Sequence, residues 1–274
     1  MSEHEVVAAT DHPATVSSLV RDLRALGVEA GITLFVHSSL SSLGWVAGGA
    51  QAVVLALLEA VGEAGTLVMP AHSTSLSEPS QWRNPPVPES WWETIRNETP
   101  AFDARLTPTR GMGRIPELFR TAPGVLRSDH PQASVAARGP NAKLVTDAHA
   151  LDSGLGEASP MARLYDVDAW VLLLGAAHAR NTSLHLSEYR ATFPGKKTVR
   201  QGAPVLVEAQ RRWVEFEDLD WDEDDFPQLG AAFESSTAEV RVGNVAQAES
   251  RLMRQRPLVD FAVEWMERHR GTVE

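Results

Sequence analysis

The chain of 274 residues contains no cysteine. This absence excludes disulfide bonds, thiolate zinc sites and cysteine nucleophiles. No apolar run approaches the ~20 residues that a membrane span needs. The first residues, MSEHEVVAATDHP, also lack the basic-then-apolar pattern of a secretory signal. We therefore expect a cytoplasmic protein with no membrane partner.

Positive charge is scarce as well, because 25 Lys and Arg face 36 Asp and Glu, for a formal net charge of −11. Binding to a phosphate backbone requires a basic surface, so we expect no nucleic-acid partner. An acidic surface attracts a cationic substrate, although it also serves solubility alone.

Periodic apolar residues predict helices that alternate with strands. Helical spacing occurs over 15–28, 48–62 and 257–270. Short apolar runs typical of buried strands occur over 32–40, 65–73, 133–139 and 170–176. Shorter helices are predicted within 107–121, 141–149 and 159–166. This order indicates an α/β protein, with a sheet flanked by helices.

The remaining segments define the expected domain organisation. Two strand-like runs over 198–220 predict a hairpin that turns at Gln210-Arg211. The Pro- and Trp-rich stretch 74–108 is expected to be an ordered irregular excursion. Residues 1–12 are expected to form a flexible N-terminal tail. Because no linker is evident, residues 13–274 are predicted to form a single composite domain.

Polar residues gather at four places after predicted strands, where open α/β sheets bind ligands. These residues are His37, Ser38 and Ser39; His72 and Ser73; Arg127, His130 and Ser134; and His178, Asn181, Thr182, His185 and Glu188.

The pair His185 and Glu188 admits more than one mechanism. On a helix the two side chains share a face one turn apart. They could ligate a metal together with a distant histidine, such as His37, His72 or His130. Alternatively, His185 could act as a general base whose tautomer and basicity Glu188 supports. A serine hydrolase is a third mechanism, but the chain lacks a G-x-S-x-G elbow.

Phosphate-binding motifs are also absent, since neither a Walker A sequence nor G-x-G-x-x-G occurs. Two glycine-flanked helix starts remain, at 41–50 and 107–115, whose backbone amides could hold a pyrophosphate.

Six segments, taken in order, resemble the aminoglycoside 3-N-acetyltransferase family, which has the antibiotic N-acetyltransferase fold. They are VHSSL (36–40), GWVAGGAQAVVLALLEAVGEAGTLVMPAHS (44–73), PAFDARLTPTRGMGRIPELFR (100–120), RSDHPQASVAARGP (127–140), GLGEASPMARLYD (154–166) and VLLLGAAHARNTSLHLSEY (171–189). The resemblance covers about residues 15 to 270.

The resemblance implies a central mixed sheet flanked by helices, with an attached smaller subdomain. It implies acetyl transfer from acetyl-coenzyme A to the 3-amino group of 2-deoxystreptamine aminoglycosides, conferring resistance, with no metal required. It also implies His185 as the base and Glu188 as its supporting carboxylate. The stretches that look like the coenzyme A site supply His37, Ser38, Ser39, Thr109, Gly111, Met112 and Gly113.

A polycationic substrate needs carboxylates, and the run EFEDLDWDEDDF (215–226) is rich in them. We expect Asp222, Asp224, Glu157 and His72 to contact the substrate. Thr109, or a neighbouring backbone amide, is the expected donor to the oxyanion. Three alternatives stay open: the same fold acylating a different small amine, a metal-dependent hydrolase, and a non-enzymatic binding protein. A homodimer is compatible with the sequence.

Overall fold

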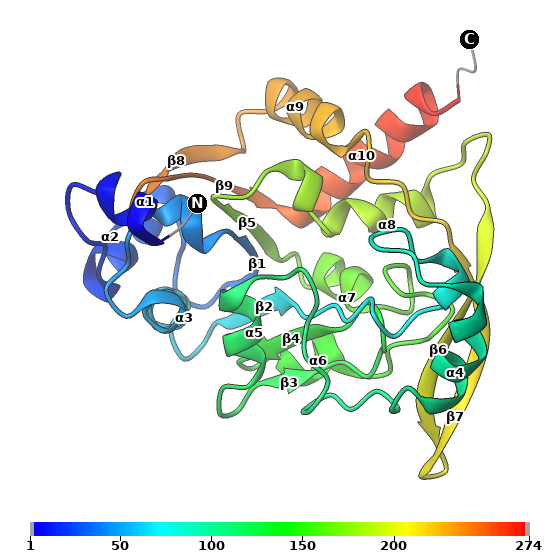
Figure 1. The fold of residues 1–274 in the computed structure, drawn as a ribbon. Helices are drawn as coiled ribbons and strands as arrows, with labels where there is room; N and C mark the ends of the chain where they lie inside the picture. The colour runs from blue at the N-terminus through cyan, green and yellow to red at the C-terminus, as the bar shows by residue number, and fades with distance from the viewer. Residues whose placement is uncertain (1–2, 272–274) are drawn as a thin grey trace.

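A seven-stranded mixed sheet forms the centre of the computed structural model, which describes residues 3–271 (Figure 1). The strand order is β3-β4-β2-β1-β5-β9-β8. The strands are β1 (Thr33–Ser38), β2 (Thr66–Pro70), β3 (Leu126–Arg127), β4 (Val135–Arg138), β5 (Trp170–Leu174), β8 (Arg241–Val245) and β9 (Ala248–Arg254). Only the central pairs β1–β2 and β1–β5 are parallel, so these three strands end at the same edge of the sheet. The expected mixed sheet is thus confirmed.

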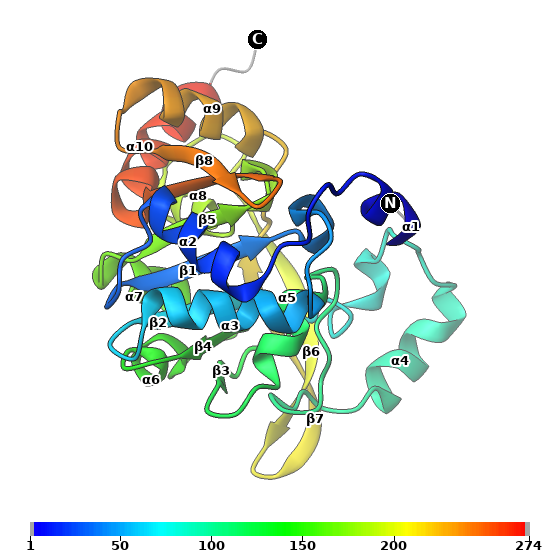
Figure 2. The same ribbon diagram turned by 90° about the vertical axis from the view of Figure 1, so that its left-hand side faces the viewer.

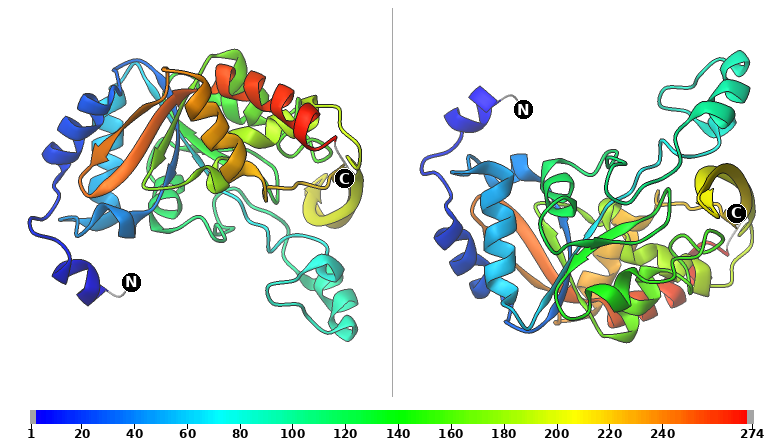
Figure 3. Two further views of the ribbon diagram at one scale, coloured as in Figure 1. Left: turned by 90° about the horizontal axis from the view of Figure 1, so that it is seen from above. Right: turned by 90° about the horizontal axis from the view of Figure 1, so that it is seen from below.

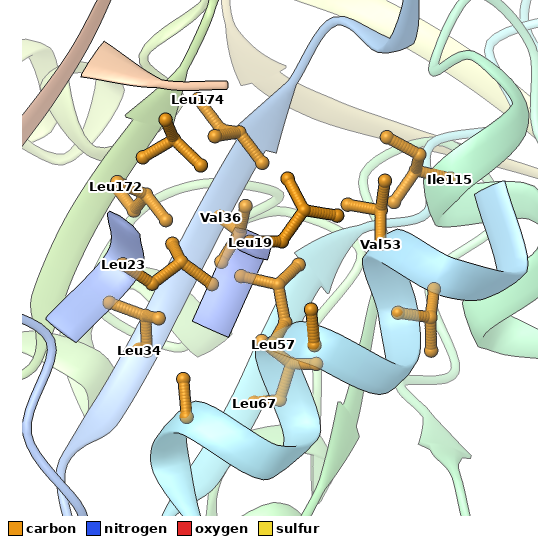
Figure 4. Close-up of a cluster of buried hydrophobic side chains, with 14 of the residues drawn as sticks. Leu19, Leu23, Leu34, Val36, Val53, Leu57, Leu67, Ile115, Leu172 and Leu174 are labelled. Carbon is orange, nitrogen blue, oxygen red and sulfur yellow. The ribbon is translucent and has the colours of Figure 1, made fainter. Parts of the chain in front are cut away.

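Helices cover both faces of this sheet (Figure 2). One face packs against α2 (Val16–Leu26), α3 (Gly49–Val61) and α5 (Arg114–Arg120). The other packs against α6 (Ala142–Thr146), α7 (Pro160–Asp166), α8 (Ser183–Arg190), α9 (Phe226–Ser236) and α10 (Gln255–His269). Figure 4 shows the first interface, where Leu34 and Val36 of β1 meet Leu19 and Leu23 of α2. Phe35, between them in the sequence, packs on the opposite face, as the two-residue period of a strand requires.

A separate two-stranded hairpin of β6 (Thr198–Val207) and β7 (Gln210–Leu219) stands at the side of the sheet together with α4 (Trp92–Glu98) (Figure 3). The expected hairpin is present, but its turn lies at Glu208 and Ala209 rather than at Gln210-Arg211. Both turn residues have positive φ, 49° and 61°. A two-residue turn of this kind matches the twist of the flanking strands, and no Asn or Gly marks it in the sequence.

Several elements differ from the sequence-based expectation. Within the predicted tail, Glu3–Ala8 form α1, while residues 1–2 and 272–274 lie outside the described part. The excursion 74–108 includes α4, which buries no residue and therefore leaves no amphipathic pattern. The pair β8 and β9 and helix α9 were not predicted. Short 3-10 turns occupy Leu40–Leu43, Pro79–Gln81, Glu89–Trp91 and His178–Arg180. None of the helices within residues 3–271 has the length and apolar content to span a bilayer.

Two buried histidines pack against each other where the β3–β4 turn meets the loop before α7. The ring centroids of His130 and His149 lie 4.6 Å apart. Nδ1 of His130 accepts hydrogen bonds from the backbone N–H groups of Gln132 (3.1 Å) and Ala133 (3.0 Å). Burial lowers the pKa of His130 to about 4, and burial likewise lowers the pKa of His149 well below its usual value. Both rings are therefore neutral in the folded protein near neutral pH.

This pair predicts a loss of stability in mild acid. An unfolded imidazole takes up a proton near pH 6.5, whereas His130 does so only near pH 4. Between these values the unfolded chain binds more protons, so the free energy of unfolding falls as pH falls, by about 2 kcal/mol at pH 5 for His130. Urea titrations at pH 7.5 and pH 5 should show a smaller loss in His130→Gln than in the wild type. His12→Gln, at an exposed position, is the control, and an equal loss in all three proteins would contradict the prediction.

Candidate active site

The carboxyl ends of the parallel strands open into a cavity of about 810 Å³. Its lining comes from the ends of β1, β2 and β5, from the turn before α5 and from the turn before α8. These lining positions include His37, Ser38, Ser39, Pro70, Gly111, Met112, Gly113, Arg114, Gly175, Arg180 and Thr182. Six of the seven residues expected to hold a cofactor therefore lie around one space, although they are some 70 positions apart in the chain.

Two polar atoms at the end of β1 have no partner. Within residues 3–271, Nε2 of His37 and Oγ of Ser38 are buried and make no hydrogen bond. A buried polar group without a partner costs free energy, so this arrangement suits a site where a ligand supplies the missing partner. The lining also holds two guanidinium groups, those of Arg114 and Arg180, which suit an anionic ligand.

The turn before α5 depends on glycine for its backbone conformation. Gly111 and Gly113 have φ of 74° and 87°, in the left-handed region that side chains disfavour. A Cβ atom at either position would meet nothing within 4 Å. The backbone conformation, and not crowding, is thus what calls for glycine there.

Thr109, the seventh expected residue, braces this turn. Its backbone N–H and its hydroxyl both donate to Oε2 of Glu117, at 2.8 and 2.7 Å. Burial opposes ionisation of Glu117, but hydrogen bonds from Arg120 and Thr109 prevail and hold the pKa of Glu117 at about 2. Because both donors of Thr109 are engaged, its expected role as an oxyanion donor does not fit this structure.

Helix α8 presents His185 and Glu188 one turn apart, as their spacing requires. Nδ1 of His185 lies 2.5 Å from Oε2 of Glu188. A carboxylate only accepts hydrogen bonds, so Nδ1 donates and the neutral ring keeps its lone pair at Nε2. Among residues 3–271, Nε2 makes no hydrogen bond, and the His185 side chain is only 11% exposed. The imidazole is therefore oriented as a base.

The ring of His185 sits in an aromatic setting. Trp221 and Phe226 flank it, with ring centroids 5.6 and 4.9 Å away. Its backbone N–H donates to the carbonyl of Thr182, which lines the cavity. His185 thus lies in the first turn of α8, which begins directly after the residue that contributes to the cavity wall.

Two further histidines lie near His185 and stay neutral. Burial, together with neighbouring imidazoles that include His185, lowers the pKa of both His37 and His72 to about 3. The Nε2 atom of His72 is buried and makes no hydrogen bond within residues 3–271. His72 does not line the large cavity, but it lies close enough to both His37 and His185 for the imidazoles to influence one another.

The expected substrate carboxylates fall into two groups. Asp222 and Asp224 are exposed on the segment between β7 and α9. The backbone N–H of Asp222 donates to Oε1 of Glu188 (3.0 Å), which fixes this segment against the base. Glu157 instead forms an ion pair with Arg190 (2.7 Å), so a local cation offsets its charge.

Sequence reasoning missed the charged partner of Glu188. Arg270, the residue directly after α10, lies 2.7 Å from Oε1 of Glu188 and also binds Asp225. No motif surrounds Arg270, and it lies 82 residues from Glu188. The aromatic neighbours Trp221 and Phe226 were also missed, although both lie inside the acidic run.

A metal centre has little support in this arrangement. Within the described residues, no group of three His, Cys, Asp or Glu side chains converges as metal ligands. Both oxygens of Glu188 already accept hydrogen bonds, from His185, from Arg270 and from a backbone amide. His185 and Glu188 are thus engaged with each other, Arg270 and Asp222 rather than with further side chains of the metal-ligating kind.

Comparisons with known proteins agree on one group of enzymes. The sequence profile of a family described as aminoglycoside 3-N-acetyltransferase matches residues 35–267. The chain is 47% identical over 262 residues to an aminoglycoside N(3')-acetyltransferase-like protein, YokD, of Bacillus subtilis, covering 95% of each chain. The crystal structure of YokD superposes with a TM-score of 0.94, covering 97% of this chain and 98% of YokD.

Two solved relatives contain bound molecules. The structure described as AAC-IIIb binary with CoASH has a TM-score of 0.85 and 34% identity, covering 96% of this chain and 100% of that chain. AAC-VIa bound to sisomicin has a TM-score of 0.86 and 34% identity, covering 95% of this chain and 100% of that chain.

Proposed function

The chain belongs to the aminoglycoside 3-N-acetyltransferase family, and we propose that it uses His185 as the general base, acetyl-coenzyme A as the donor and a cationic 2-deoxystreptamine aminoglycoside as the acceptor. It is an acyltransferase that acetylates the 3-amino group of an aminoglycoside, as the sequence led us to expect. The observation that carries the mechanism is the buried His185–Glu188 pair, in which Nε2 of His185 makes no hydrogen bond within residues 3–271. The pair lies one helical turn from Thr182, which lines the same cavity as His37 and Ser38.

The cavity at the strand ends suits the donor. Bound acetyl-coenzyme A would supply a thioester, whose carbonyl carbon is open to attack by an amine. The cationic groups of Arg114 and Arg180 would pair with its phosphates, and the glycine turn at Gly111 to Gly113 leaves room for the backbone to approach them. The relative solved with CoASH supports this assignment.

His185 would move the proton of the acceptor amine. An aminoglycoside amine is largely protonated near neutral pH, and attack requires its lone pair. The ammonium would first release one proton to solvent, which frees the lone pair. Nε2 would take a second proton as the nitrogen bonds to the acetyl carbon, and Glu188 would stabilise the resulting imidazolium through Nδ1. The carbon–sulfur bond then breaks, and the imidazolium would return its proton to the leaving thiolate.

The unpartnered donors at the end of β1 would receive negative charge. Charge develops on the acetyl oxygen as the amine attacks, and donors positioned beforehand lower that barrier. His37 is neutral, so Nε2 can carry a hydrogen, and Ser38 offers a hydroxyl. These groups replace Thr109 as our candidates for the oxyanion donors.

Asp222 and Asp224 would attract the acceptor. Both are exposed, and their segment is held against Glu188, so their negative charge lies close to the base. Acetylation converts a cationic amine into a neutral amide, which removes one positive charge from the drug. We infer that this modification confers resistance and takes place in the cytoplasm. A homodimer stays a prediction, testable by light scattering.

Thiol release tests the function directly. The protein incubated with acetyl-coenzyme A and a panel that includes sisomicin should release free thiol. His185→Gln should lower kcat/KM at least about a hundredfold, because the base is lost, while acetyl-coenzyme A still binds in calorimetry. His12→Gln should behave as the wild type. Thiol release with other small amines only would favour the alternative acceptor, and full activity of His185→Gln would rule out the proposed base.

Removing charge from the acidic segment should weaken binding of the acceptor. In the double variant Asp222→Asn, Asp224→Asn, KM for the aminoglycoside should rise about threefold to tenfold at low salt with kcat nearly unchanged. The difference should shrink at 0.5 M NaCl, because salt screens exposed charges. Glu63→Gln, an exposed carboxylate at the other edge of the sheet, serves as the matched control. Salt-independent kinetics in the double variant would contradict this role.

Loss of the Glu117 contacts that hold the glycine turn should weaken binding of acetyl-coenzyme A only. Glu117→Gln loses the charged acceptor for Thr109 and Arg120, so the turn before α5 should become less ordered. We expect KM for acetyl-coenzyme A to rise about fivefold, since ordering the turn then opposes binding, while KM for the aminoglycoside stays constant. Glu93→Gln on α4 provides the control, and equal changes in both KM values would argue against a donor-specific turn.

A further inference from the structure

Arg270 joins three parts of the molecule at the active site. Nη1 donates to Oε1 of Glu188 at 2.7 Å, and Nε and Nη2 bind both carboxylate oxygens of Asp225 at 2.7 and 2.6 Å. Nη2 also donates to the backbone carbonyl of Asp222 at 2.7 Å. The guanidinium packs on the ring of Phe193, and its side chain is only 10% exposed. Helices α8 and α10 and the segment before α9 thus meet at one side chain.

We propose that Arg270 is a positioning residue for acetyl transfer, which pairs with the buried Glu188, leaves one of its oxygens for His185 and holds the acidic segment at the base. The proposal rests on the proposed role of His185 as the base. Arg270 itself has no part in the chemistry, because it contacts Glu188 and not the reacting atoms.

Arg270 supplies the positive partner of a buried carboxylate. Glu188 is 1% exposed, and a buried charge is destabilising unless an opposite charge and hydrogen-bond donors surround it. Although burial opposes it, hydrogen bonds to Asp225 and Glu188 raise the pKa of Arg270 above its usual value. The guanidinium therefore stays charged, and its charge faces Oε1 of Glu188 at every working pH.

Arg270 also fixes the orientation of the Glu188 carboxylate. Arg270 and the backbone N–H of Asp222 occupy Oε1 of Glu188, so Oε2 is the oxygen left for Nδ1 of His185. This arrangement holds the imidazole in the tautomer with a lone pair at Nε2. Without Arg270 the carboxylate could rotate, and His185 would lose its fixed direction.

Arg270 also holds the acidic segment before α9 in place. Arg270 binds it at Asp222 and Asp225, on either side of the exposed Asp224. The same segment carries Trp221 and Phe226, which flank the His185 ring. Arg270 forms an ion pair with Asp225, whereas Asp222 and Asp224 have no ion pair within the described residues. Asp225 thus has a structural role, and Asp222 and Asp224 remain available to a cationic substrate.

The charges around the His185–Glu188 pair predict opposite shifts of the kcat/KM pH profile for two variants. The groups facing the His185–Glu188 pair are Arg270 from α10, Asp222 and Asp225 from the acidic segment, Lys196 after α8, His37 from β1 and His72 after β2. Arg270→Gln removes a positive charge, so the protonated base becomes easier to form. The acidic limb of the kcat/KM profile should then move to higher pH. Glu188→Gln removes a negative charge and should move it to lower pH.

The experiment compares Arg270→Gln, Arg270→Lys and Arg268→Gln in steady-state kinetics from pH 5.5 to 9. Arg268 is the matched control, because it lies two residues away on the same helix and its side chain is 62% exposed. We expect Arg270→Gln to lose about tenfold to a hundredfold in kcat, as misplaced catalytic groups do. Its KM for acetyl-coenzyme A should change less than twofold, and the acidic limb of its kcat/KM profile should move to higher pH. Arg270→Lys should recover part of kcat and keep the wild-type limb, and Arg268→Gln should match the wild type throughout.

A folded Arg270→Gln with unchanged kcat and an unchanged acidic limb would overturn the proposal. If this variant fails to fold, Arg270→Lys decides, because a lysine cannot reproduce all the contacts. A lowered kcat with an unchanged KM for acetyl-coenzyme A then supports positioning, and wild-type kcat refutes it. Full activity of His185→Gln would instead show that the proposed base is wrong, whatever Arg270 does.

Discussion

The buried carboxylate of Glu188 is the group on which the rest of the site depends. A nearly inaccessible anion must be surrounded by donors, and here the donors are His185, Arg270 and the N–H of Asp222. Each comes from a different part of the chain. The contacts of this one charge therefore orient the imidazole of His185, attach the end of α10 to the site and hold the acidic segment beside it. The contacts that stabilise Glu188 are the same ones that position the proposed base.

The sheet supplies the other half of the site. Because β1 is parallel to both β2 and β5, their carboxyl ends meet at one edge, and the connections that follow them enclose the cavity. His37 and Ser38 at the end of β1 thus lie beside the segment that leads from β5 to α8. The antiparallel strands on either side widen the sheet.

Much of the fold was predictable, and the failures have physical causes. Runs such as 170–176 are apolar because the strand is covered on both faces, so periodicity finds them. The edge strand β8 buries only its last residue, β9 mixes charged and apolar residues without regular alternation, and α4 buries nothing, so none of them leaves a strong pattern. Helix α9 did carry a signal in Phe226, Leu229 and Phe233, which the acidic run before it obscured.

The sequence by itself determined the local chemistry: the spacing of His185 and Glu188, the left-handed glycines before α5 and the excess of carboxylates near residue 220. These depend on a few neighbouring residues, and helix geometry alone relates the base to its carboxylate. Tertiary structure decided which carboxylates remain unpaired and which bind a partner within the protein. It pairs Glu157 with Arg190, Glu117 with Thr109 and Glu188 with Arg270. Burial and distant partners set those pairings, and a linear pattern contains no record of either.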